Sequence, residues 1–150
     1  MPIKSFRGLI ADGTVEKIRL STNNGLTGYK IVKFELFPFK PGQETVENVV
    51  TVHTIEPAAS TSAVEVNFNS PTLLAAATFH EAHSDARIDQ QVSIFDNVVF
   101  NQDIFVAHTD TVGAIAVNFY LELEQVKLDL NEATVATLKD MRANYTNLDP

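Results

Sequence analysis

The sequence predicts one all-β domain, an antiparallel β-sandwich or barrel followed by a short C-terminal α-helix. Its 150 residues are 45% hydrophobic, enough for one compact core but not for two. The β-branched residues Val and Ile dominate the apolar set, and such side chains favour sheets. Turn signals recur at the short intervals typical of sandwiches, at residues 12–13, 23–25, 38–42, 57–62, 69–71, 84–85 and 109–113.

Alternation of apolar and polar residues predicts the individual strands. The apolar phase shifts between Ile31 and Val32, which predicts one bent strand with a bulge. A run of three alanines from Ala75 makes the segment 73–79 apolar on both faces. This pattern fits a central strand or a short buried helix, and we predict a strand. The predicted strands cover residues 29–37, 49–55, 64–68, 73–79, 92–95, 98–106 and 115–123.

A helix is predicted after residue 128, where the hydrophobic period changes. Asp129 precedes Glu132 by three residues, as in a capping box, and the helix is expected to end near Asn144. The predicted domain is therefore a sandwich over 1–128 with a helix over 129–146. The helix has one apolar stripe, which must pack either on its own sandwich or on another subunit: Val135, Leu138, Met141 and Tyr145.

Composition and charge exclude several functions. The formal net charge of -8 argues against nucleic acid as a partner, and no apolar run approaches the length of a membrane span. The absence of cysteine excludes disulfides, thiolate zinc sites and cysteine nucleophiles. The charge is uneven, since residues 1–40 carry +4 and the rest carries -12, which suits head-to-tail pairing of copies or an ordinary solvated surface.

One segment holds a cluster of potential metal ligands, His80, His83 and Asp85. Imidazole and carboxylate are suitable ligands for zinc. The spacing of three between the histidines differs from the zincin motif, which requires a spacing of four on a helix. We therefore expect a polar loop, no bound metal and no cofactor.

Hydrolytic chemistry is also not expected. His108 and Asp110 with Ser93 have the residue types of a catalytic triad, but no Gly-x-Ser-x-Gly elbow is present. Glu122 and Glu124 share one face of a strand, as exposed polar residues of a one-sided sheet normally do. The chain is expected not to be an enzyme.

Several phrases resemble small virion structural proteins of marine tailed bacteriophages, over nearly the entire chain. They are IRLSTNNG at 18–25, GYKIVKF at 28–34, IFDNVVFNQDIFV at 94–106, YLELE at 120–124 and LDLNEATVATL at 128–138. The resemblance implies a jelly-roll-like sandwich made in the cytoplasm of a bacterial host and built into the virion. It implies a capsid decoration or cement protein whose partners are itself, as a homo-oligomer such as a trimer, and the major capsid protein.

Three alternatives stay open. A tail or head-to-tail connector component would have the same features. A carbohydrate-binding module would need exposed aromatics, yet Trp is absent and Tyr29, Tyr120 and Tyr145 are scattered. A small metal-dependent enzyme would use the histidine cluster, with His53 or His108. If the chain is a virion protein, the predicted interface between subunits is the helix stripe of Val135, Leu138, Met141 and Tyr145.

Overall fold

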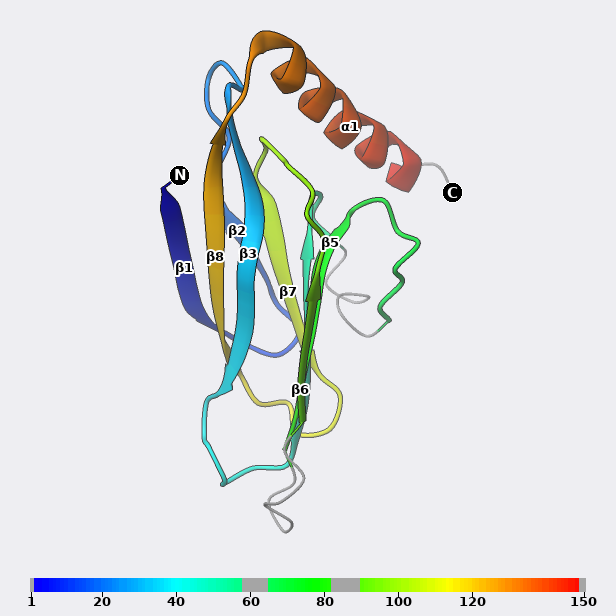
Figure 1. The fold of residues 1–150 in the computed structure, drawn as a ribbon. Coiled ribbons are helices and arrows are strands. Elements are labelled where there is room, and N and C mark those ends of the chain that lie inside the picture. Colours follow the sequence, from blue (N-terminus) through cyan, green and yellow to red (C-terminus); the bar gives the residue numbers. More distant parts are fainter. Residues whose placement is uncertain (1, 58–64, 82–89, 149–150) are drawn as a thin grey trace.

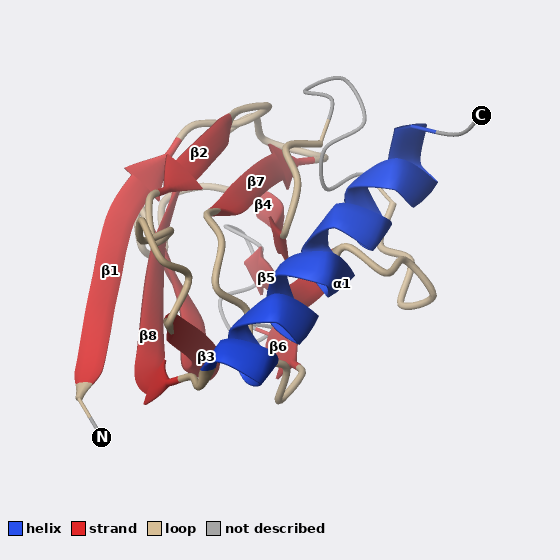
Figure 2. Ribbon diagram, turned by 90° about the horizontal axis from the view of Figure 1, so that it is seen from above, coloured by secondary structure: helices blue, strands red, loops and turns tan. Residues whose placement is uncertain are grey.

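The chain forms two antiparallel β-sheets packed face to face, with one helix across an end of the sandwich (Figures 1 and 2). The structure is a computed structural model and describes residues 2–57, 65–81 and 90–148. The elements are β1 (Ile3–Ile10), β2 (Val15–Ile18), β3 (Thr27–Pro38), β4 (Val46–His53), β5 (Leu73–Glu81), β6 (Gln90–Phe95), β7 (Ile104–Asp110), β8 (Val117–Lys127) and α1 (Leu130–Leu148). The predicted fold class is confirmed.

The strand order is that of a jelly roll with one altered pairing. The sheets run β1-β8-β3 and β2-β7-β4-β5-β6. A long antiparallel hairpin rolled into a sandwich pairs first with last strand, second with seventh, third with sixth and fourth with fifth. Three of these pairs are present, whereas β6 forms its ladder with β5. The remaining contact, between β3 and β6, includes a hydrogen bond of 2.5 Å from Ser93 Oγ to the Phe34 carbonyl oxygen.

The core lies between the sheets and is centred on β8. Every second residue of this strand, from Val117 to Leu123, is buried. On the partner strand, Phe34 and Ile31 are buried although their positions differ in parity, because the register shifts between Ile31 and Lys33. A bulge adds one residue to a strand and thereby switches which positions face inward. The predicted bent strand and its bulge are confirmed.

One strand prediction is wrong, one is right only in its last part, and two strands were not predicted. Residues 65–68 belong to no strand, and Asn67 instead begins a turn in which its carbonyl accepts the Ser70 N–H at 3.0 Å. Residues 98–103 lie between β6 and β7 and form no strand, and Phe100 pairs with Tyr29 in a single isolated bridge. The last part of this predicted strand, 104–106, begins β7. The edge strands β1 and β2 lie before the first predicted strand. The segment at Ala75 is a strand, as predicted.

Carboxylates fix the loops at the ends of the sandwich. Asp103 accepts the backbone N–H groups of Leu20 at 2.7 Å and Ser21 at 2.9 Å, and Lys17 Nζ lies 3.4 Å from it. At the opposite end, Glu81 accepts the Gly42 N–H. Burial alone would raise the pKa of Asp103, but the backbone donors outweigh it and hold this pKa below its usual value.

Stability is expected to fall as the pH drops below neutrality. Burial lowers the pKa of both His53 and His108 below 6.5, although the carboxylates of Asp12 and Asp110 oppose this effect at His108. The unfolded chain therefore binds protons below pH 6.5 that the folded chain does not yet accept. The unfolding free energy should decrease below that pH by up to about 1.4 kcal/mol per pH unit for each histidine.

Urea unfolding at about pH 8, about pH 6.5 and about pH 5 measures this slope. His53→Gln removes one of the two titrating groups and should make the slope shallower. Equal stability at the highest and lowest pH would contradict the assignment of neutral, buried imidazoles.

Candidate assembly interface at the C-terminal helix

Helix α1 begins at a capping residue that the sequence identifies. The carboxylate of Asp129 accepts the Glu132 N–H at 2.7 Å. This hydrogen bond satisfies one of the free N–H groups at the helix start and lowers the pKa of Asp129. The predicted cap is confirmed, and the helix extends to Leu148, beyond the predicted end.

One buried side chain, Asn101, fastens the helix to the sandwich. Its Nδ2 donates to Thr137 Oγ1 at 2.9 Å, and it lies 3.1 Å from the Gly25 carbonyl oxygen and 3.4 Å from that of Ala133. Asn101 is 1% exposed and Ala133 4% exposed, so water does not replace these bonds. The helix therefore packs through small and polar residues rather than through its apolar stripe.

The described residues of the predicted apolar stripe are largely exposed to solvent. Val135 is 54%, Leu138 48% and Met141 59% exposed, and the side chain of Tyr145 lies outside the described part. Leu130, at the start of the helix, is also exposed. The sequence allows this stripe to pack either on its own sandwich or on another subunit. In the structure, the sandwich does not cover the described part of the stripe. An exposed stripe of this kind is typical of protein contact sites.

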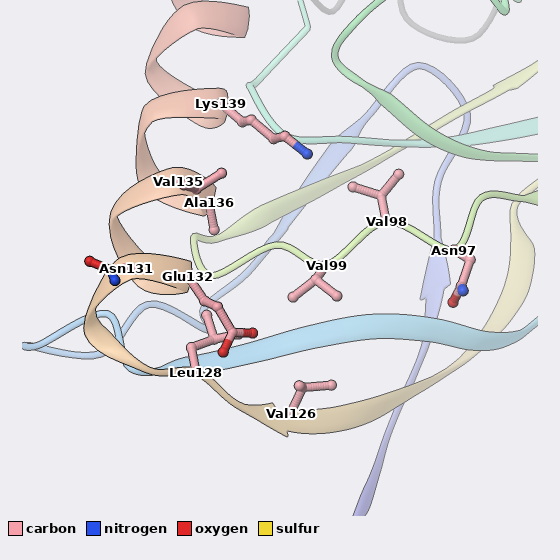
Figure 3. A pocket seen from close by; sticks show the side chains of 10 residues that line it. All are labelled: Asn97, Val98, Val99, Val126, Leu128, Asn131, Glu132, Val135, Ala136 and Lys139. Carbon is pink, nitrogen blue, oxygen red and sulfur yellow. The ribbon is translucent and has the colours of Figure 1, made fainter.

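A groove follows the inner edge of the helix (Figure 3). It has a volume of about 550 Å³ and separates α1 from the segment that connects β6 to β7. Val98 and Val99 stand across the groove from Val135 and Ala136, and Lys139 lies at one end (Figure 3). The exposed stripe thus continues into an apolar depression.

Asp140 is an unfavourable group on the packed side of the helix. Burial and the negative charge of Asp103 both raise the pKa of Asp140. Its Oδ1 is buried and has no hydrogen-bond partner among the described residues. The docking of α1 is consequently weaker than that of an ordinary core helix.

The histidine cluster is only partly described. His80 lies on β5, and its Nδ1 is 3.6 Å from Glu47 Oε2. His83 and Asp85 lie outside the described residues. Within residues 2–57, 65–81 and 90–148, no three His, Asp or Glu side chains are placed to hold a metal ion. The remaining histidine of β4, His53, has its Nε2 2.9 Å from Thr51 Oγ1.

The structure does not assemble the triad residues. His108 and Ser93 lie in one row of the five-stranded sheet with β4 and β5 between them, about 14 Å apart at three strand spacings. His108 Nε2 lies 2.8 Å from Asn48 Oδ1, and Ser93 donates to a backbone carbonyl. The Asp110 carboxylate accepts backbone N–H groups instead of orienting the imidazole.

The two glutamates of β8 have partners on neighbouring positions. Glu122 accepts the Tyr120 hydroxyl at 2.8 Å, and Lys30 Nζ lies 3.3 Å from Glu124. Tyr29 is buried. These contacts match a solvated sheet face and leave neither tyrosine free as a sugar-stacking platform.

Sequence reasoning missed the residues that set the position of the helix. The alternation predicts a strand over 98–106, interrupted at 101–103, and gives Asn101, Val98 and Val99 no part in holding the helix. A polar residue within an apolar run was the only available signal, since its partners lie 76 and 36 residues away in the chain.

No helix among the described residues is long and apolar enough to cross a membrane. Comparison of the chain with protein-family models, with curated proteins and with solved structures found no match.

Proposed function

We propose that this chain is a non-enzymatic structural protein of a tailed-phage virion that assembles into an oligomer through helix α1, as a capsid decoration protein. The observation that carries the assembly part is the exposure of Val135, Leu138 and Met141 on a helix whose packed side is small and polar. The jelly-roll fold suits a particle component, and the sequence resemblance described above directs the proposal to phage virions.

The oligomer test compares two variants that change the charge equally. Leu138→Asp with Met141→Asp alters residues that are 48% and 59% exposed, and the control Leu9→Asp with Phe37→Asp alters residues that are 48% and 64% exposed. Light scattering after gel filtration should show an oligomer for the wild type and the control but a monomer for the helix variant. Because all four sites are exposed, each variant should keep its unfolding free energy within about 1 kcal/mol.

The virion part is tested separately on capsids of the encoding phage assembled without this chain. The wild type should coat such capsids and the helix variant should not. A metal assay on the same chromatographic peak tests the histidine cluster. A wild-type monomer that ignores capsids would overturn the proposal, and stoichiometric metal on such a monomer would favour the alternative at His80.

A further inference from the structure

A second uncovered apolar surface lies on the outer side of the five-stranded sheet. We call it the β6 patch and define it as Val49, Thr78, Val92 and Ile94. Val92 is 53% and Ile94 49% exposed, and the ladder places Thr78 beside Val92 and Val49 beside Thr78. Its members are uncharged, although the outer side of an antiparallel sheet is normally polar.

The other sheet shows the usual pattern, which makes the β6 patch a specific feature. Leu9 and Phe37 are also exposed there, but the adjacent row of the ladder contains Arg7, Tyr120 and Glu35. Charges therefore interrupt the apolar surface of that sheet. On the five-stranded sheet the corresponding row, Glu47, His80 and Gln90, lies at one side of the β6 patch and does not separate its members.

From these surfaces we infer that the β6 patch is the docking site for helix α1 of a second copy of this chain. An apolar helix stripe and an apolar sheet face each need a covering layer, and one copy of this protein has both uncovered. The helix stripe and the β6 patch also have similar lengths. Val135 to Met141 spans about 9 Å along a helix, and Val92 to Ile94 spans about 7 Å along a strand.

Charge around the two surfaces favours the same pairing. Lys139 is exposed beside the helix stripe and lines the groove. The patch is flanked by Glu47, whose side chain is 51% exposed, and by the exposed Asp96 directly after β6. Asp96 also lines a cavity with Lys139 in the same chain, so Glu47 is the carboxylate that distinguishes the two arrangements. A helix–helix contact between identical stripes would place Lys139 near its own copy, without Glu47.

The contact is heterologous, because different surfaces of the two copies meet. Repeated head-to-tail contacts close into a ring when the rotation permits it. This inference rests on the proposed assembly through α1 and goes further by naming the surface that receives the helix.

A mixing experiment tests the pairing directly. The helix variant Leu138→Asp with Met141→Asp and the patch variant Val92→Asp with Ile94→Asp should each be monomeric by light scattering. Each retains one intact surface, so an equimolar mixture should form a complex of twice the 16.5 kDa chain mass. The control Leu9→Asp with Phe37→Asp should keep the mass of the wild type.

The outcomes separate the two proposals. A helix variant that keeps the wild-type mass overturns the proposed assembly through α1. A monomeric helix variant together with a patch variant of wild-type mass leaves that assembly intact and overturns the β6 patch. Two monomeric variants that do not associate on mixing also overturn it. If circular dichroism shows that the aspartates unfold β6, Val92→Thr with Ile94→Thr keeps strand propensity and should still weaken assembly.

Discussion

Asp110→Ala is expected to lower the unfolding free energy by about 3 kcal/mol, because backbone N–H groups lose a charged acceptor. Asp110 is 6% exposed and ends β7. Its carboxylate accepts four backbone N–H groups at 2.9 to 3.1 Å, from Glu47, Val112, Gly113 and Ile115. Burial alone would raise the pKa of Asp110, but these donors outweigh it and keep the group ionised.

The loop that Asp110 holds contains one strained residue and one crowded residue. Ala114 lies in the left-handed region with a φ of 54°, which costs a residue with a side chain about 1 kcal/mol. A Cβ at Gly113 would collide with the Thr45 carbonyl oxygen, so this part of the loop lies directly against the backbone before β4. The hydrogen bonds that backbone N–H groups donate to the Asp110 carboxylate offset the cost of this loop conformation.

Urea unfolding at neutral pH measures the effect, with Asp96→Ala as the control. Asp96 is exposed, and its removal changes the charge equally, so a loss below about 0.5 kcal/mol is expected. Because the folded pKa of Asp110 is lowered below 3.8, its contribution is present above that pH and is lost as the pH falls through the folded value. Equal losses for Asp96→Ala and Asp110→Ala would contradict the clamp.

Alternation of apolar and polar residues predicted the strands whose inner face packs against the opposite sheet along their length. In β8 every second residue meets the opposite sheet, so period-2 spacing is imposed along the whole strand. Edge strands are less constrained, because one side has no ladder partner. In β1 both Ile3 and Leu9 face outward and are exposed, and this breaks the alternation on which the prediction depends.

The candidate site was predictable as a pattern but not as a geometry. Helical spacing identified Val135, Leu138 and Met141, because an amphipathic stripe depends on local sequence alone. Whether that stripe meets its own sandwich depends on Asn101, whose partners belong to a turn and a helix far away in the chain. Likewise, the β6 patch exists only through ladders that join three strands.

Asn101→Ala should release helix α1 while the sandwich stays folded. The variant loses the hydrogen bonds to Thr137 and Gly25 and leaves their partly buried acceptors without this donor, at a cost of about 2 kcal/mol. Few other contacts resist opening, since the packed side of the helix is small and contains the unpartnered Asp140 oxygen. Amide exchange in residues 130–148 should therefore become about 30-fold faster, the factor that corresponds to this free energy.

Asn118→Ala is the matched control, because its Nδ2 lies 3.5 Å from the Pro38 carbonyl oxygen near the other end of β3, away from α1. Exchange in the helix should be unchanged in that variant. If Asn101→Ala instead accelerates exchange in β8 as much as in α1, the helix and the sandwich open as one unit and the anchor is not local. If it acts locally, the same variant should also weaken assembly, because a released helix must be ordered again before its stripe can bind another copy.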